Sequence, residues 1–458
     1  MNPQIERTPT GIPGLDALLQ GGFIKNSIVL IAGHPGAGKT TLGATFIYNG
    51  ATKYNEKGVY LSFCESKNDF FTYMKNFGMD FERLEKGGKV KYIDALVVTK
   101  LADVNEVIRL FFENILEMNA KRVVIDSLSA ITNLMTPSEA RSLITNTLTK
   151  MLKNLGVTAI LIADLPYGEV KIGHGIEEFI TDVVIILHSR IVDERLERYL
   201  EIRKMRGTRL EQSIVPYIIR EKGFEVIAPL SPELQGSFKY EMYTTGVSEL
   251  DKMLGGGLAK SSISLIVGPA GSGKSLLALN IALKNAMDKR KVLFLSLNES
   301  KEQVYKRITS MGYNIHEVEP FLHVCAINPF GYPMYVLLSK FRELLNQLKP
   351  DLYIVDSLER LMFALGQKCF VEYVSKRVFE LKASEITTII TMSANYPEDK
   401  IYIDDVVDNL IVLKIYYDKE SVEKYLYIWK SRIMPYPPYP AKMEILEKGK
   451  IKLTTKQE

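Results

Sequence analysis

Two short glycine-rich segments of the chain each end in a lysine followed by a hydroxyl residue. Both fit the pattern G-x-x-x-x-G-K-[ST], and each follows an apolar run of the kind that forms a buried strand. The glycines let backbone N–H groups point at phosphate oxygens, the lysine adds positive charge, and the hydroxyl can hold Mg²⁺. We therefore expect two sites for ATP with Mg²⁺. Their residues are Gly33, Gly36, Ala37, Gly38, Lys39, Thr40 and Thr41 in the first segment, and Gly268, Gly271, Ser272, Gly273, Lys274, Ser275 and Leu276 in the second.

An aspartate ends an apolar run downstream of each glycine-rich segment. Asp126 and Asp356 occupy these strand ends, where a carboxylate can orient Mg²⁺ beside bound phosphates. The alternative is an aspartate that caps the following turn. Because a phosphate-binding segment accompanies each aspartate, we expect Thr40 with Asp126, and Ser275 with Asp356, to hold the metal.

A glutamate follows the second predicted strand in each half of the chain. A carboxylate at this point, Glu65 or Glu299, can polarise the water that attacks a γ-phosphate. The alternative is a helix-capping or first-turn carboxylate, because Ser66 and Ser300 begin helical patterns. We expect the catalytic role for both glutamates.

A lysine and an arginine stand two residues apart in each half, at Lys204 and Arg206 and again at Lys430 and Arg432. On a strand this spacing points both cations to one face, which is usually a solvated face. Their recurrence and their distance in sequence from the phosphate segments favour another role. We expect each pair to reach the γ-phosphate held by a neighbouring subunit and to stabilise the charge of phosphoryl transfer.

The chain contains an internal repeat that covers nearly its whole length. Residues 10–16 return as 245–251, and residues 123–128 return as 353–358, with only small insertions between the copies. Two tandem domains of one fold explain this pattern. The predicted boundaries are 1–228 for the first domain, 229–244 for a linker and 245–458 for the second domain.

Apolar, β-rich runs alternate with helical patterns within the first repeat. This alternation predicts an α/β fold with a mostly parallel, doubly wound sheet and helices on both faces. Ligands in such folds bind at the carboxyl ends of the strands. The predicted strands are 27–32, 59–63, 122–126, 158–163 and 183–188, and the predicted helices are 39–53, 68–77, 104–118 and 138–155.

The composition is that of an ordinary globular protein, with 46% hydrophobic and 24% charged residues. The net charge of +4 gives no argument for a nucleic-acid partner. The three cysteines lack the paired spacing of a zinc site or a disulfide framework. No apolar stretch approaches the length of a membrane span, and residues 1–9 have no signal-peptide core. We therefore expect a cytoplasmic protein without a membrane partner.

Taken together, these motifs resemble the KaiC family of ATPases. The resemblance covers nearly the whole chain and rests on T-G-x-x-x-L-D before each phosphate segment, F-x-E-S at 63–66, D-S-L at each strand-end aspartate, K-M-R-G-T at 204–208 and G-I-E-E-F at 175–179. It implies two tandem RecA-like P-loop NTPase domains and a double-ring homohexamer with ATP between subunits. In that family the K-x-R pair comes from the neighbouring protomer.

The sequence departs from the circadian members of that family at informative positions. Those proteins carry paired glutamates after the second strand, whereas here the first of each pair is Cys64 or Asn298. Their adjacent Ser–Thr phosphoacceptors align with Asp404-Asp405, and Glu178-Phe179 stands in the first repeat. The departures imply a KaiC-like ATPase with a weakened general base and without Ser/Thr autophosphorylation at that site.

Two other functions remain open. A RecA-like DNA-acting ATPase would direct basic loops into a central channel, but residues 164–182 and 393–408 each hold five acidic residues against one lysine. We therefore do not expect a nucleic-acid partner. An ATP-gated scaffold with negligible turnover is the other alternative, favoured by the missing first glutamates. Our expectation is a slow ATPase, more active in its first half, whose nucleotide state sets the affinity of the ring for an unidentified regulatory protein.

Overall fold

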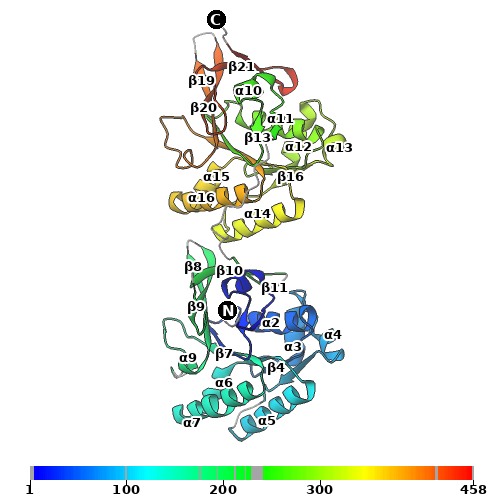
Figure 1. The fold of residues 1–458 in the computed structure, drawn as a ribbon, viewed down its shortest axis with the longest axis vertical. Coiled ribbons are helices and arrows are strands. Elements are labelled where there is room, and N and C mark those ends of the chain that lie inside the picture. The colour runs from blue at the N-terminus through cyan, green and yellow to red at the C-terminus, as the bar shows by residue number, and fades with distance from the viewer. Residues whose placement is uncertain are drawn as a thin grey trace. The chain divides into compact units, whose positions relative to one another are not determined.

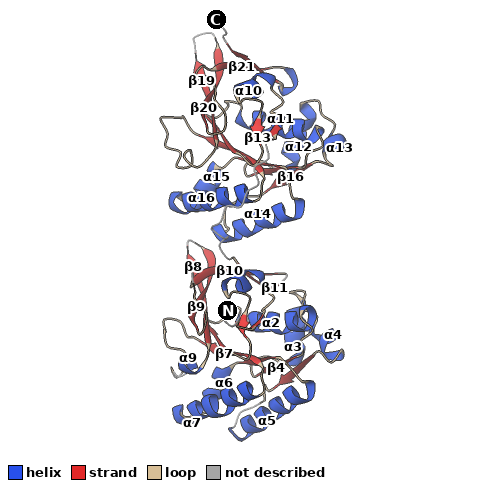
Figure 2. Cartoon of the chain, viewed as in Figure 1, coloured by secondary structure: helices blue, strands red, loops and turns tan. Residues whose placement is uncertain are grey.

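The chain folds as two compact units, Met1–Pro229 and Leu230–Glu458. In a computed structural model, each unit is a central sheet with helices packed on both faces (Figures 1 and 2). The structure describes residues 5–97, 101–173, 175, 177–192, 194–210, 213–221, 223–227, 241–417 and 421–455.

The first unit is built on a nine-stranded sheet of order β11-β10-β9-β8-β3-β7-β6-β4-β5. The strands from β8 to β5 run parallel, and β9 to β11 extend the β8 edge in antiparallel fashion. A separate small sheet pairs β1 with β2. The strands are β1 (Arg7–Thr8), β2 (Phe23–Ile24), β3 (Ile28–Gly33), β4 (Gly58–Ser62), β5 (Val90–Asp94), β6 (Arg122–Asp126), β7 (Thr158–Asp164), β8 (Val183–Val192), β9 (Arg195–Met205), β10 (Ile214–Arg220) and β11 (Gly223–Val226).

Two apolar cores hold the helices of the first unit against the two faces of the sheet. Val29 and Ile31 of β3 belong to one core, and Ile28 and Leu30 belong to the other. A central parallel strand is buried on both faces, which explains its continuous apolar run. The helices are α1 (Pro13–Leu18), α2 (Lys39–Lys53), α3 (Lys67–Lys75), α4 (Phe81–Lys86), α5 (Leu101–Met118), α6 (Leu128–Thr132), α7 (Pro137–Ser142), α8 (Lys150–Asn154) and α9 (Glu177–Ile180), with a π-helix at Leu143–Thr149.

The second unit repeats this plan, with a nine-stranded sheet of order β16-β15-β17-β18-β14-β19-β20-β21-β22 and a small β12–β13 sheet. Its strands are β12 (Met242–Tyr243), β13 (Leu258–Ala259), β14 (Ile263–Gly268), β15 (Val292–Ser296), β16 (Leu322–Ala326), β17 (Leu352–Asp356), β18 (Thr387–Ser393), β19 (Asn409–Tyr417), β20 (Val422–Ser431), β21 (Ala441–Ile445) and β22 (Ile451–Thr455). Its helices are α10 (Ser248–Met253), α11 (Lys274–Met287), α12 (Lys301–Ser310), α13 (Ile315–Val318), α14 (Met334–Leu348), α15 (Glu359–Leu365) and α16 (Gln367–Ala383), with a 3-10 helix at Glu447–Gly449.

The predicted α/β class, with two tandem RecA-like domains on mostly parallel sheets, is confirmed. The predicted helix at 138–155 is instead α7, the π-helix and α8 in succession. Most of the predicted linker at 229–244, namely residues 229–240, lies outside the described residues. Within its last part, Met242 and Tyr243 form β12 and pair with β13, and Tyr243 is buried. This pairing makes residues 242–243 part of the second unit.

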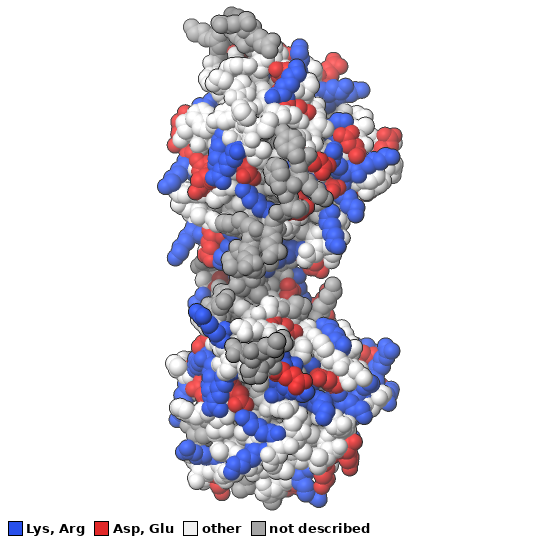
Figure 3. Space-filling view, viewed as in Figure 1, with Lys and Arg blue, Asp and Glu red and all other residues white. Residues whose placement is uncertain are grey.

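Charged side chains of both signs are distributed over each unit. On the face shown in Figure 3, lysine and arginine are interspersed with aspartate and glutamate among the described residues. On this face the mixing leaves no broad positive patch of the kind that attracts nucleic acid among the described residues. Across the described part of the chain, no helix combines the length and apolar character needed to cross a membrane.

Candidate functional site

The two phosphate loops have the same backbone form. Each leaves the carboxyl end of the central strand, β3 or β14, and enters the first turn of α2 or α11. Gly38 and Gly273 are the N-cap residues, with φ of +92° and +102°, and no side chain caps either helix start. The first-turn N–H groups are therefore available to an anion, and the helix dipole favours negative charge there.

The side chains within the loops divide between the loop surface and the core. Ala37, Ser272 and Thr41 are buried, and Leu276 packs partly buried against the second core. These four predicted binding residues can therefore serve a phosphate chiefly through their backbone N–H groups. Gly36 and Gly271 have φ of +74° and +77°, a left-handed conformation that glycine adopts without strain.

The lysine of each loop folds back onto its own loop. Its Nζ donates to two backbone carbonyls at the start of the loop, which places the positive charge over the position that phosphates would take. The contacts are Lys39 with Gly33 (2.9 Å) and His34 (3.2 Å), and Lys274 with Gly268 and Pro269 (2.9 Å each). Burial lowers the pKa of Lys274, while the nearby charges of Glu359 and Asp356 oppose that shift.

A carboxylate lies near each loop lysine, but the two halves supply it from different elements. In the first half, Asp164 at the end of β7 forms an ion pair with Lys39 at 3.1 Å. In the second half Ser393 ends the matching strand β18, and its N–H donates to Glu359 at the start of α15 at 3.2 Å. Ser129 occupies the position of Glu359 in the first half and accepts the Asp164 N–H at 2.8 Å. Serine and carboxylate have exchanged places.

The predicted metal residues meet in both halves. Thr40 Oγ1 donates to Asp126 Oδ2 at 2.7 Å, and Ser275 Oγ donates to Asp356 Oδ1 at 2.9 Å. Mg²⁺ prefers oxygen ligands and usually keeps water and substrate phosphates in its coordination shell. A hydroxyl and a carboxylate therefore fit this ion when phosphates supply the rest. Among the described residues no cluster of three or more His, Cys, Asp or Glu could hold a metal.

Each strand-end aspartate is buried and receives a second hydrogen bond. Tyr60 on β4 donates to Asp126 at 2.8 Å, whereas Thr391 on β18 donates to Asp356 at 2.5 Å. Burial raises the pKa of Asp126, and the hydrogen bonds from Thr40 and Tyr60 partly oppose this by favouring the carboxylate. The buried aspartates are ordered acceptors, with their oxygens directed toward the helix that follows the loop.

The two candidate general bases are not helix caps. Ser66 caps α3 by accepting the Asp69 N–H, and Ser300 caps α12 in a capping box with Gln303. Glu65 and Glu299 each stand one residue before the capping serine. The helices are therefore capped by Ser66 and Ser300 rather than by the glutamates, and neither glutamate provides the side-chain cap of the helix that follows it.

The two glutamates differ in their surroundings. Glu65 Oε2 is buried without a hydrogen-bond partner in the described part of the chain. Burial raises the pKa of Glu65, and the negative charges of Asp126 and Asp69 raise it further. In contrast, Glu299 forms an ion pair with Arg307 of α12. Among the described residues, the carboxylate of Glu299 is therefore held by an arginine, whereas that of Glu65 is not.

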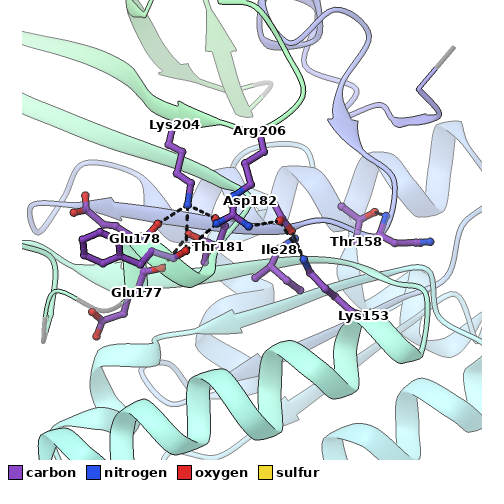
Figure 4. A network of polar contacts seen from close by, with 11 residues as sticks. Ile28, Lys153, Thr158, Glu177, Glu178, Thr181, Asp182, Lys204 and Arg206 are labelled. Atoms are coloured by element: carbon purple, nitrogen blue, oxygen red, sulfur yellow. Dashed lines mark hydrogen bonds and ion pairs between the residues drawn. The ribbon is translucent and has the colours of Figure 1, made fainter. Parts of the chain in front are cut away.

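The lysine–arginine pairs contact backbone carbonyls of their own unit. Lys204 Nζ donates to Glu178 O at 2.8 Å and to Thr181 O at 2.6 Å, and Arg206 pairs with Asp182 at 3.4 Å (Figure 4). Burial lowers the pKa of Lys204, and the charge of Arg206 lowers it further. In the second half, Lys430 and Arg432 bind the carbonyls of Asp404 and Asp405 in the same way.

These pairs lie at the opposite end of the sheet from the phosphate loop of their own unit. The Arg206 N–H donates to Asp182 O, and the Asp182 N–H donates to Ile28 O at the amino end of β3. Gly33 ends the same strand, about 17 Å further along at roughly 3.3 Å per residue. The second unit repeats the arrangement through Arg432, Asp408 and Ile263. Neither pair can touch a nucleotide bound by its own unit.

The acidic stretches 164–182 and 393–408 are less negative in the folded chain than a count of their own charges suggests. In the first, Asp164 pairs with Lys39, Asp182 with Lys153 and Arg206, and Glu178 with Arg203, while Glu177 is buried. In the second, Asp408 pairs with Lys382 and Glu398 with Lys414. The cations lie mostly outside the counted stretches, so the sequence count overstates the repulsion of a phosphate backbone.

Several site residues were not predicted from the sequence: Tyr60, Asp164, Arg307, Glu359 and Thr391. Asp164 and Thr391 lie on the strand beside the loop strand, which becomes apparent only when the strand order is known. Arg307 has a signal in the sequence, because it follows Glu299 by eight residues and aligns with Tyr73 in the first repeat.

Comparisons with known proteins agree with this geometry. A family model described as "ATPase: KaiC" matches residues 8–231 and 243–458. The chain is 32% identical over 400 residues to the circadian clock protein KaiC3 of Synechocystis sp., covering 84% of this chain and 79% of that protein. It is 28% identical over 447 residues to the circadian clock oscillator protein KaiC of Synechococcus elongatus, covering 93% and 85% respectively. A KaiC from Parathermosynechococcus lividus is 28% identical over 443 residues, covering 93% and 82%.

Proposed function

The chain belongs to the KaiC family of ATPases, and we propose that it binds Mg·ATP in both halves and hydrolyses it slowly, mainly in the first. We further propose that it assembles as a cytoplasmic homohexameric ring whose nucleotide state sets its affinity for a regulatory protein. The observation that carries the first proposal is the hydroxyl–carboxylate pair beside each phosphate loop, Thr40–Asp126 and Ser275–Asp356. We assign the two ATPase domains to residues 1–228 and 245–458.

In the first half the residues divide the work of hydrolysis. The N–H groups of α2 and the Lys39 ammonium hold the β- and γ-phosphates, for which Lys39 leaves Asp164. Bound Mg²⁺ would supply positive charge at the phosphate oxygens, held by Thr40 and Asp126. Glu65 accepts a proton from the attacking water. At the same time the water oxygen bonds to the γ-phosphorus, and the bond between that phosphorus and the ADP oxygen breaks. The raised pKa of Glu65 makes it a stronger base than an ordinary glutamate.

The lysine–arginine pairs require a second protomer. Because each pair lies at the amino end of the central strand, a catalytic pair cannot act on the nucleotide of its own unit, and we place its target in another copy of the chain. A head-to-tail interface of this kind generates a ring when its rotation closes. Lys204 and Arg206 would then add charge stabilisation to the phosphoryl group at the interface.

Mixing two inactive variants tests this assembly. Both would carry Asp356→Asn to silence the second half; one would add Lys39→Ala, and the other Lys204→Ala with Arg206→Ala. Random mixing into rings should restore about one quarter of the interfaces, with a matching recovery of ATPase turnover. The control mixes Lys39→Ala with Asp126→Asn, two lesions of the same nucleotide site on one protomer, and should recover nothing. Mixed rings without recovery in the first experiment would contradict action between protomers.

Autophosphorylation is not part of this proposal. The segment bound by Lys430 and Arg432 presents Asp404 and Asp405, which have no hydroxyl to phosphorylate. An ATP-gated scaffold is the second candidate, and one observation favours it for the second half. The ion pair of Glu299 with Arg307 leaves that half without a free general base.

A further inference from the structure

The ion pair between Glu299 and Arg307 is present at the site of the second half, whereas the site of the first half has the same backbone arrangement but lacks this pair among the described residues. The N–H of Glu65 donates to Ser62 Oγ at 3.1 Å, and the N–H of Glu299 donates to Ser296 Oγ at 2.9 Å. Both glutamates follow the second strand of their unit and precede a helix capped by serine. The backbone therefore offers both carboxylates to the same position, and only the side-chain partners differ.

Arg307 reaches Glu299 from two turns along α12. Its Nη2 binds Glu299 Oε1, and the two side chains are 29% and 30% exposed, so the pair is partly shielded from water. A guanidinium and a carboxylate form a charge-assisted hydrogen bond that is stronger than a neutral one. The matched residue in the first half is Tyr73, which has no charge and is half exposed. Within the described residues Glu65 has no ion pair at all.

The neighbouring position shows the same contrast. Asn298 Oδ1 accepts from Arg360 Nε at 2.7 Å, and its Nδ2 donates to Ser357 at 2.5 Å. The side chain of Cys64, in the first half, makes a long contact with the Ser127 hydroxyl at 3.7 Å, and no arginine among the described residues is paired with it. Two arginines thus hold both residues at the end of β15, and neither has a counterpart beside β4, where Tyr73 and Ala130 take the matching places.

We propose that Arg307 is a positioning residue that holds Glu299 out of the water-activating position and makes the second half a slow, nucleotide-retaining site. The proposal rests on the proposed function, in which Glu299 is the general base of that half. A carboxylate oxygen engaged by a guanidinium is a weaker proton acceptor, so it must leave the arginine before it can activate water. Removal of Arg307 should accelerate hydrolysis without changing ATP binding.

The test uses the full chain with Glu65→Gln, which leaves the second half as the main source of turnover. In this background Arg307→Tyr installs the residue of the first half and should raise kcat about ten-fold with KM for ATP unchanged. Arg307→Lys keeps the charge without the forked geometry and should give a smaller rise. Lys306→Tyr removes a neighbouring cation of the same helix and should change nothing. Unchanged or lower kcat in Arg307→Tyr, with thermal unfolding as in the parent, overturns the proposal.

Two further variants separate this proposal from the function on which it rests. Adding Glu299→Gln to Glu65→Gln should abolish the residual turnover and the gain from Arg307→Tyr. If the residual turnover persists, Glu299 is no general base, and the proposed function of this half fails together with the role of Arg307. If Glu299→Gln abolishes turnover but Arg307→Tyr gives no gain, only the positioning role fails. The reverse graft, Tyr73→Arg, should lower the turnover of the first half about ten-fold.

Discussion

The two halves of this chain place the same phosphate loop at the same point of the same sheet and surround it with different side chains. The loop lysine has a direct carboxylate partner in Asp164 in the first half, whereas Glu359 stands near it in the second. The buried aspartate receives its second hydrogen bond from Tyr60 in the first half and from Thr391 in the second half. The shared backbone gives both halves the same phosphate loop, and in the proposed function the neighbouring side chains set how fast each half hydrolyses ATP.

The largest expected difference follows from removing each of the two carboxylates proposed to hold Mg²⁺. Asp126→Asn should lower total ATPase turnover about ten-fold or more, because it neutralises the charge that holds Mg²⁺ in the faster half. Asp356→Asn should lower total turnover by less than about two-fold, because the slower half contributes little. Steady-state phosphate release measures both. Equal losses in the two variants would contradict the inequality between the halves.

The pH dependence of turnover tests the proposed role of Glu65 as the general base of the first half. A general base acts as a carboxylate, and burial raises the pKa of Glu65. If Glu65 is that base, the activity of the first half should fall as the pH drops through the raised pKa. An exposed glutamate has a pKa of about 4.3. The acidic limb of the pH profile should therefore lie at a higher pH than that value. Glu65→Gln should lower turnover about 100-fold in that half and abolish the limb. A limb that survives this substitution belongs to another group.

The strands and loops of the site were predictable because each motif is contiguous in sequence. The predicted strand 122–126 coincides with β6, and the predicted helix 39–53 coincides with α2. The antiparallel strands β10 and β11 were not predicted, since their pairing to β9 depends on contacts distant in sequence. Periodicity also does not distinguish a π-helix from an α-helix over the seven residues Leu143–Thr149. Asp164 and Arg307 could not be placed without the strand order and the direction of α12.

The exchanged hydrogen-bond donors to the buried aspartates offer a smaller, matched perturbation. Tyr60→Phe installs the residue found at this position in the second half, Phe294, and removes one donor to Asp126. The pKa of Asp126 should rise further, so Mg²⁺-dependent turnover should be lost at a higher pH as the solution is acidified. The loss at neutral pH should be about five-fold, corresponding to about 1 kcal/mol.

Thr391→Val is the control for that change, because it removes the equivalent donor from Asp356 at similar volume. It should leave total turnover nearly unchanged and act only on the second half. If Tyr60→Phe is also silent, the hydrogen bond to Asp126 does not tune the site.

The smallest expected effect concerns the ion pair of the first loop. Asp164→Asn frees Lys39 for the phosphates and should lower KM for ATP about two- to three-fold, because Asp164 is 53% exposed and such pairs are weak. Ser393→Ala, at the matching strand end, should leave KM unchanged. Binding of a fluorescent ATP analogue measures both variants, and weaker binding by Asp164→Asn would show that the carboxylate assists ATP rather than competing with it.

The central claim is that the chain hydrolyses ATP rather than transferring its phosphate or merely holding it. Purified full-length protein incubated with Mg²⁺ and ATP labelled on the γ-phosphate tests this directly, with Asp126→Asn as the matched control. If the chain is an ATPase, the label should appear as free phosphate, and Asp126→Asn should greatly slow its release. Label retained on the protein would indicate a kinase, and label remaining on ATP would indicate a scaffold; either result would contradict hydrolysis as the activity of this chain.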